Sequence, residues 1–188
     1  LYGAILNPGC RFFDKRIGQS TTLTGRQIAK HMASKVNEVI TGEYDHVGKA
    51  IIYGDTDSCY FSAYKILKPD IDKGLIPWTK EAVTQLYDQI GEEVNETFAQ
   101  FMLDQFHCPK TRGEVIRAGR EIVGSKGLFI TKKRYAVLVY DKEGKRKDKD
   151  GKPGEIKAMG LDLKRSDTPE FIQDFLSEVL EMVLTGAT

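Results

Sequence analysis

The sequence predicts an α+β domain in which β-strands pack on two long helices. Two amphipathic patterns predict the helices, one from Thr21 to Ile40 and the other over residues 79–106. Two strand-like apolar runs, residues 50–53 and 59–61, flank a Gly-Asp-Thr-Asp turn and predict a tight β-hairpin. Because both runs are apolar on both faces, we expect this hairpin to be central in a mostly antiparallel sheet and covered by helices.

The rest of the chain adds strands and one more helix. Further strands are expected at four runs, residues 114–123, 127–131, 134–140 and 156–163. A Gly-Ser-Lys-Gly turn at 124–127 separates the first two. Residues 62–78 indicate a loop-rich insertion, and the charged residues 141–154 a solvated hairpin tip. Thr168 is the expected N-cap of a final helix that runs to about Leu184.

Local signals also set the ends of the first long helix. Ser20, Thr21 or Thr24 can cap it, and Gly42 ends it. His31 lies within this helix without other metal ligands nearby in the sequence, so we expect it to be structural or exposed.

Composition excludes several classes of protein. The 188 residues include 28 basic and 27 acidic side chains, so any surface for nucleic acid has to be local. The odd number of cysteines (Cys10, Cys59 and Cys108) and the absence of a CxxC pair indicate reduced thiols in a cytoplasmic compartment. No run approaches the length of a membrane span. The chain begins at Leu1 in mid-pattern, which indicates a piece of a longer polypeptide.

The hairpin turn places two acids close together. Asp55 and Asp57 lie two residues apart at the tip of a stiff element. Like charges held this close repel each other unless a cation neutralises them. Mg²⁺ suits such a site, since it binds one or two carboxylates together with substrate phosphates. The alternative is a solvated loop, which is the usual role of an isolated Asp-x-Asp.

Residues 53–58, Tyr-Gly-Asp-Thr-Asp-Ser, resemble motif C of family B (replicative) DNA polymerases. The resemblance implies a polymerase palm that uses two Mg²⁺ ions to join a dNTP to a primer 3′-hydroxyl. It implies that Asp57 bridges both ions with an Asp of motif A, which these 188 residues lack. Asp55 would support the site or bind metal intermittently, Thr56 would lie against the nucleotide, and Ser58 against DNA.

Two other segments carry the resemblance. Tyr2 and Gly3 match the end of motif B, Asn-Ser-x-Tyr-Gly, and would line the pocket of the incoming nucleotide. Glu121 matches an acid that these polymerases place close to the metal pair, which makes it a third candidate metal ligand.

A basic segment, Lys132-Lys133-Arg134-Tyr135, resembles the polymerase motif Lys-Lys-x-Tyr, which holds the primer–template duplex. If the segment is a strand, Lys133 and Tyr135 share one face and Lys132 and Arg134 the other. Cations beside an aromatic ring suit a nucleic-acid backbone. The alternative is an exposed basic strand end.

Residues 159–169 resemble the passage from palm to thumb, and several segments resemble the polymerases of tailed bacteriophages. The resemblance divides the chain into the end of a fingers helix with a connector (1–18), a palm (19–165) and the start of a thumb (166–188). It implies primer–template DNA and dNTP as partners, together with the exonuclease, fingers and thumb of the same chain and a sliding clamp. If the parent is viral, it acts in the host cytoplasm. Because motif A is lacking, we expect the 188 residues alone to be inactive.

Two alternatives remain open. One is another palm nucleotidyltransferase, such as a reverse transcriptase or a cyclase. The other is a DNA-binding module derived from a polymerase, without catalytic activity.

Overall fold

The chain folds into helices and antiparallel β-sheets, which confirms the expected α+β class. The computed structural model describes residues 2–149, 151–161 and 168–186. They form two compact units, and the long helix α4 contributes residues to both. Within the described residues, no helix is both long and apolar enough to cross a membrane.

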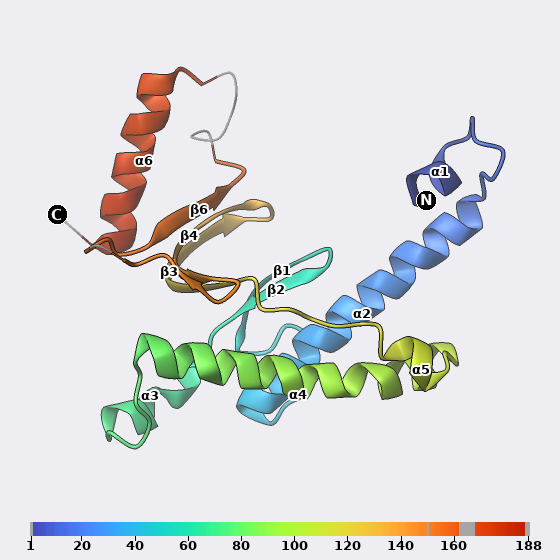
Figure 1. The fold of residues 1–188 in the computed structure, drawn as a ribbon, viewed down its shortest axis with the longest axis horizontal. Coiled ribbons are helices and arrows are strands. Elements are labelled where there is room, and N and C mark those ends of the chain that lie inside the picture. The colour runs from blue at the N-terminus through green and yellow to red at the C-terminus, as the bar shows by residue number, and fades with distance from the viewer. Residues whose placement is uncertain (1, 150, 162–167, 187–188) are drawn as a thin grey trace. The chain divides into compact units, whose positions relative to one another are not determined.

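Unit 1 comprises residues 1–79 and 89–118. Its elements in chain order are α1 (Tyr2–Leu6), α2 (Lys15–Thr41), β1 (Ile51–Asp55), β2 (Ser58–Phe61), α3 (Tyr64–Asp72), α4 (Lys80–Phe106) and α5 (Lys110–Gly113) (Figure 1). The first residues of α4, 80–88, belong to unit 2. The two long helices predicted from the sequence are therefore confirmed as α2 and α4.

The first long helix begins earlier than predicted. Asp14 caps α2 by accepting hydrogen bonds from two amides of the first turn, at 2.8 and 3.3 Å. The residues predicted as caps lie inside the helix: Ser20, Thr21 and Thr24. The Thr21 hydroxyl donates to the Ile17 carbonyl one turn back, an arrangement that is available to hydroxyl residues within helices as well as at their ends. The predicted end is confirmed, since Gly42 is left-handed (φ 81°) and its N–H bonds the Glu38 carbonyl.

The core of unit 1 lies where α2 meets α4. His31 of α2 is buried, stacks on Phe101 with ring centroids 3.9 Å apart, and meets Phe98 edge-on. Its Nε2 lies 2.9 Å from the Thr97 hydroxyl, which itself donates to the Val94 carbonyl. Nε2 therefore carries the proton, and Nδ1 accepts from the Tyr44 hydroxyl at 2.8 Å. The structural role predicted for His31 is confirmed.

The hairpin is not the centre of a larger sheet, so that expectation was wrong. β1 and β2 form an antiparallel sheet of their own, with no further strand paired to it in the described part of the chain. One face contacts α2, and Ile51 and Tyr53 are half-buried. Ile52 points the other way and is 51% exposed. Apolar residues on both faces show that burial is favourable, but they do not specify which element supplies it.

Two segments of unit 1 differ from their predicted structure. The insertion at 62–78 contains the helix α3, which continues through Pro69. The run at 114–123 is not a strand over most of its length, because α5 precedes it and strand pairing starts at Ile122. In the latter case Asn95 of α4 satisfies the backbone, bonding both the N–H and the carbonyl of Ala118. The Asn95 side chain thus makes the hydrogen bonds that a neighbouring strand would otherwise provide.

Unit 2 comprises residues 80–88 and 119–188. Its elements besides the start of α4 are β3 (Ile122–Thr131), β4 (Arg134–Lys142), β5 (Lys145–Arg146), β6 (Glu155–Met159) and α6 (Glu170–Thr185). The central strand β4 pairs with β3, β5 and β6, all antiparallel. Residues 135–141 of β4 are all buried. Such a continuous run is expected of a strand with neighbours on both sides.

The turn predicted at 124–127 is absent, because β3 runs through it without interruption. The glycines pair with β4, Gly124 with Val139 and Gly127 with Val137. The pairing of β3 with β4 shifts register on both sides of Gly124, as at a β-bulge, and the strand continues. Glycine in these positions allows close approach, since a Cβ at Gly124 would lie 2.3 Å from the Val137 side chain. Packing against the buried strand outweighs the local turn signal.

The charged segment after β4 is more ordered than the predicted solvated tip. A two-residue turn at Glu143 and Gly144, both with positive φ, joins β4 to β5. Beyond it, Arg146 bonds Asp148 (2.8 Å) and pairs with Glu81 at the start of α4 (2.5 Å). The Asp148 side chain is only 6% exposed, and the two cations paired with it (Lys80 and Arg146) hold the pKa of its carboxyl well below the usual range. Ion pairing with α4 therefore fixes this segment.

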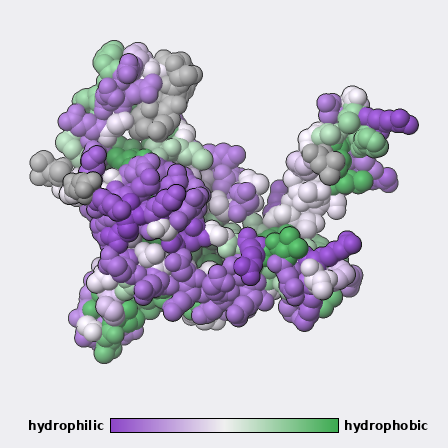
Figure 2. Space-filling view, viewed as in Figure 1, coloured by the Kyte–Doolittle hydropathy of each residue, from purple (hydrophilic) through white to green (hydrophobic). Residues whose placement is uncertain are grey.

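The helix α6 covers one face of the sheet of unit 2 (Figure 1). Leu180 and Leu184 pack on Ala136 and Leu138 of β4. The predicted extent of this helix is confirmed, but its cap is not, because Pro169 precedes the first turn and no side chain caps it. In Figure 2, hydrophilic residues gather over the strands of unit 2, whereas hydrophobic residues remain on the surface of α6. The predicted strand at 156–163 ends at 159, and residues 162–167 of the palm-to-thumb passage lie outside the described residues.

Candidate functional site

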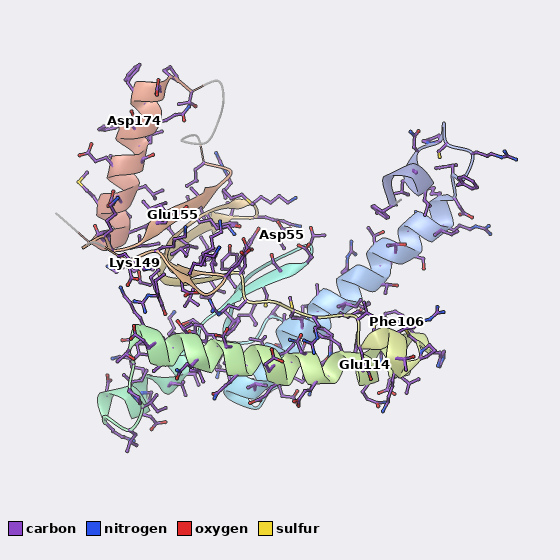
Figure 3. The ribbon with its side chains drawn as sticks, viewed as in Figure 1. Asp55, Phe106, Glu114, Lys149, Glu155 and Asp174 are labelled. Carbon is purple, nitrogen blue, oxygen red and sulfur yellow. The ribbon has the colours of Figure 1, made fainter. Side chains whose placement is uncertain are left out.

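Two acids stand at the tip of the β1–β2 hairpin in unit 1 (Figure 3). Asp55 ends β1 and pairs with Ser58, which begins β2, so Thr56 and Asp57 form a two-residue turn. Asp55 is half-buried, and its Oδ1 accepts hydrogen bonds from the Thr56 amide (2.9 Å) and hydroxyl (3.3 Å). Asp57 is exposed. The tight hairpin predicted from the sequence is confirmed, and it gives the two acids different surroundings.

A buried amide on α2 anchors the chain directly before this hairpin. Asn37 is fully buried, and its Oδ1 accepts from the Ala50 amide at 3.0 Å. Its Nδ2 donates to the Glu43 carbonyl at 2.8 Å. Gly48 packs so closely on this side chain that a Cβ there would lie 2.1 Å from Nδ2. Asn37 was not predicted as part of the site, because its partners lie beyond the end of the helix, at Glu43 and Ala50.

The predicted nucleotide-binding residues at the start of the chain lie on the short helix α1. Tyr2 is 44% exposed, and the Cβ position of Gly3 has no atom within 4 Å. α1 packs on the first turns of α2 through Leu6, whose side chain occupies the place of a Cβ at Gly18. Tyr2 and Gly3 are therefore surface residues held at one end of α2, while Asn37 and the hairpin lie toward its other end (Figure 1).

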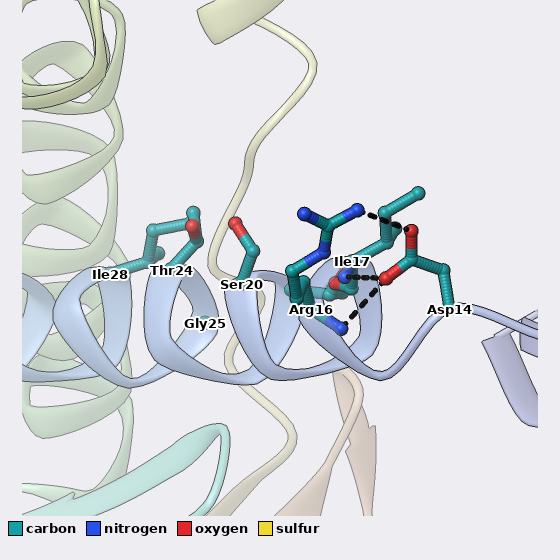
Figure 4. A pocket seen from close by; sticks show the side chains of 8 residues that line it. Asp14, Arg16, Ile17, Ser20, Thr24, Gly25 and Ile28 are labelled. Carbon is teal, nitrogen blue, oxygen red and sulfur yellow. Dashed lines mark hydrogen bonds and ion pairs between the residues drawn. The ribbon is translucent and has the colours of Figure 1, made fainter. Parts of the chain in front are cut away.

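An open groove runs along the first half of α2 (Figure 4). Small and polar side chains with two isoleucines line it: Asp14, Arg16, Ile17, Ser20, Thr21, Thr24, Gly25 and Ile28. At one end, the two backbone amides that Asp14 caps keep the pKa of its carboxyl below the ordinary value. The sequence analysis assigned several of these residues to helix capping and did not identify the groove.

The third predicted metal ligand, Glu121, belongs to unit 2. It lies directly before β3 and forms an ion pair with Lys157 of β6 at 2.5 Å. Its neighbour Arg120 binds Asp88 of α4 and the buried Asp141 of β4. Among the described residues, no cluster of three or more acidic, His or Cys side chains could hold a metal ion. Asp55 and Asp57 are near each other by sequence and turn geometry within unit 1, whereas Glu121 belongs to unit 2.

The predicted basic segment forms a turn and the start of a strand, which corrects the expected alternation. β3 ends at Thr131 and β4 begins at Arg134, so Lys132 and Lys133 form the two-residue turn between them. Lys133 has a left-handed backbone (φ 62°) and therefore does not share a strand face with Tyr135. A turn forms here because Thr131 and Arg134 pair with each other.

The last two residues of this segment differ in burial, since Arg134 is exposed and Tyr135 is buried. The Arg134 Nε donates to the Gly160 carbonyl at 3.1 Å. Tyr135 is 5% exposed and stacks on Phe129, with ring centroids 5.6 Å apart. The two lysines are exposed at the tip of the hairpin.

The cysteines are unpaired, as predicted: Cys10, Cys59 and Cys108. Burial raises the pKa of the Cys59 thiol, next to the acidic turn, to about 11. A thiolate is therefore disfavoured there.

Comparison with known proteins shows which class of protein the chain resembles. No family model matches the chain. Over 98% of its length, the chain is 33% identical to the DNA-directed DNA polymerase of Escherichia phage RB69 and 30% identical to that of Enterobacteria phage T4. It is also 27% identical, over 95% of its length, to DNA polymerase II of Escherichia coli (strain K12). The resemblance to DNA polymerases is therefore confirmed along nearly the whole chain.

The chain spans about a fifth of the length of these relatives, 21% of each phage polymerase and 20% of the E. coli enzyme. Because the similarity extends over 98% of the chain, it covers both units.

Proposed function

We propose that this chain is part of the palm of a family B DNA polymerase and supplies two acids to Mg²⁺-dependent nucleotidyl transfer. The observation that carries the proposal is the rigid two-residue turn between Asp55 and Ser58. It occurs within a sequence similar to DNA polymerases over nearly its full length. The proposed domains are the end of the fingers (1–18), the palm (19–165) and the start of the thumb (166–188).

The turn supplies some of the oxygen ligands that a hard cation such as Mg²⁺ needs. Carboxylate oxygens are the ligands that Mg²⁺ prefers, and the turn offers two such groups. Asp57 is exposed, whereas Asp55 Oδ1 is engaged by Thr56. Asp57 would therefore hold metal, and Asp55 would hold the turn in place through Thr56. On the resemblance to family B polymerases, the second bridging acid would be the Asp of motif A, which these residues lack, and Glu121 is a candidate to lie close to the metal pair.

In the proposed reaction, the 3′-hydroxyl of a primer attacks the α-phosphate of a dNTP, and pyrophosphate leaves. Bound Mg²⁺ supplies charge neutralisation at the attacking and leaving oxygens. Asp57 holds negative charge at the turn, and Asp55 fixes the turn through Thr56. Tyr2 and Gly3 would line the nucleotide pocket, while the lysine turn would bind the phosphate backbone of the duplex.

Replacement of Asp57 by Asn tests the proposal in the full-length polymerase. Asp57→Asn keeps the shape of the side chain and removes its charge, so the single-turnover rate should fall by about three powers of ten or more, each tenfold being about 1.4 kcal/mol. Asp55→Asn should cost less, because an amide oxygen can still accept from Thr56. Asp104→Asn on the exposed surface of α4 is the control and should retain activity.

Duplex affinity should survive Asp57→Asn, since the turn binds metal and not DNA. An Asp57→Asn enzyme with an undiminished rate contradicts the proposal. Loss of DNA binding without loss of rate at saturating DNA instead favours the alternative of a non-catalytic DNA-binding module.

A further inference from the structure

We propose that Gly160 and Arg134 form a lock that fixes the backbone of the Lys132–Lys133 turn, and that Arg134 is a positioning residue and not a contact to DNA. The inference rests on the proposed function, because it assigns how the lysine turn is held for duplex binding. We define the lock by these two residues.

The turn needs support because Lys133 adopts a left-handed conformation, with φ 62°. This region is unfavourable for residues with a side chain, and they remain in it where the surrounding structure holds them. The pairing of Thr131 with Arg134 closes the turn from within the hairpin. A second restraint comes from β6, whose last residue, Met159, pairs with Tyr135.

Gly160 follows Met159 and comes into direct contact with the turn. A Cβ at Gly160 would lie 2.0 Å from the Lys133 carbonyl oxygen and 3.1 Å from its carbon. The backbone of Gly160 is itself left-handed, with φ 64°. Glycine is thus required twice, once for its own conformation and once for the approach to Lys133. Any side chain here has to displace the lysine turn or the end of β6.

Arg134 contacts Gly160 through a hydrogen bond and through its side chain. Its Nε donates to the Gly160 carbonyl at 3.1 Å, and its Cγ would lie 3.2 Å from a Cβ at Gly160. The side chain therefore lies over Gly160, and one of its donors is used within the protein. A lysine at this position keeps the charge but has no donor at the place of Nε. Lys132 and Lys133 lie in the turn itself, and both are exposed.

A double-mutant cycle tests the lock in the full-length polymerase. Gly160→Ala is measured with both lysines present and again in the Lys132→Ala/Lys133→Ala background. The readout is the affinity for a primer–template duplex at several salt concentrations. The matched control is Gly144→Ala, because Gly144 is also left-handed (φ 78°) but has no atom within 4 Å of its Cβ position.

If the lock acts through the lysines, Gly160→Ala should weaken duplex binding at least about threefold when they are present and less than about twofold when they are absent. Gly144→Ala should change affinity by less than about twofold in both backgrounds. Arg134→Lys should behave like Gly160→Ala although it keeps the charge. It leaves Gly160 intact, so it carries the test if Gly160→Ala fails to fold.

Two outcomes overturn the lock. The first is an equal loss of affinity in both backgrounds, which would mean that Gly160 supports the fold in general. The second is a fall of the salt slope by about 0.9 on Arg134→Ala in the lysine-free background, the signature of one direct phosphate contact. The proposed function is tested separately, by the Lys132→Ala/Lys133→Ala variant. If removal of both lysines leaves affinity and salt slope unchanged, the turn does not bind the duplex at all.

Discussion

Asn37 provides the sharpest test of how the acidic hairpin is held in place. Its side chain is 0% exposed and bonds the Ala50 amide, the Glu43 carbonyl and the Thr41 hydroxyl. Asn37→Ala removes all three bonds. Ala50 is also 0% exposed, so water cannot replace the lost acceptor, whereas Glu43 is exposed and its carbonyl can hydrate.

The loss of stability on Asn37→Ala therefore comes mainly from the Ala50 N–H, which stays buried without an acceptor. Such a group costs about 1–3 kcal/mol, and the cavity left by the amide adds about 1 kcal/mol. We expect the free energy of local opening of residues 48–62 to fall by about 2–4 kcal/mol. This corresponds to about 30- to 1,000-fold faster exchange of their amide hydrogens with solvent. Two backbone bonds report on this segment, from Ile51 N–H to Gly48 and from Ser62 N–H to Ala50, both 2.9 Å long.

Native-state hydrogen exchange, followed by mass spectrometry on the full-length protein, measures this change by segment. Asn7→Ala is the control, because Asn7 also accepts from a backbone amide, that of Gly9, but does so at an exposed site. Gly48→Ala should reproduce the effect of Asn37→Ala, since its Cβ would overlap the Asn37 amide. The reasoning is refuted if Asn37→Ala accelerates exchange at 48–62 no more than Asn7→Ala does, or if protection falls equally along the whole chain.

Three further predictions concern activity, pH and an ion-pair network. The 188-residue chain alone, given primer–template, dNTPs and Mg²⁺, should not extend the primer, because on the proposed function its acids act together with a motif A Asp supplied by another part of the polymerase; template-directed extension in a gel assay would contradict this. Burial, and to a lesser extent the charge of Lys35, lowers the pKa of His31 to about 4, so the unfolded chain binds the proton more readily. The free energy of unfolding should fall as pH drops from about 6.5 towards 4, and His31→Gln should flatten that decline in denaturant titrations. Arg120→Gln leaves the carboxylate of Asp141, 3% exposed, without its cation and should destabilise the protein by about 3–5 kcal/mol. Arg16→Gln, at a site 91% exposed, should change stability by less than about 0.5 kcal/mol in the same titration.

Much of the local structure follows from the sequence by itself. The period of apolar residues predicted both long helices, a start signal at residues 168–170 predicted α6, and Gly42 marked the end of α2. The Gly-Asp-Thr-Asp string predicted a hairpin with two acids at its tip. These features depend on interactions within a few residues of each other, so the local order of side chains is sufficient to specify them.

Tertiary structure decided the features that depend on distant partners. Asn37 reaches Ala50 across thirteen positions, and Gly160 meets the Lys133 carbonyl across twenty-seven. The buried strand β4 turned a predicted glycine turn into the continuous strand β3. In each case a backbone group had to find a partner once water was excluded, and the fold determined which partner was near. The sequence thus identified the candidate residues, and long-range packing determined the conformation in which the acidic hairpin and the Lys132–Lys133 turn are held.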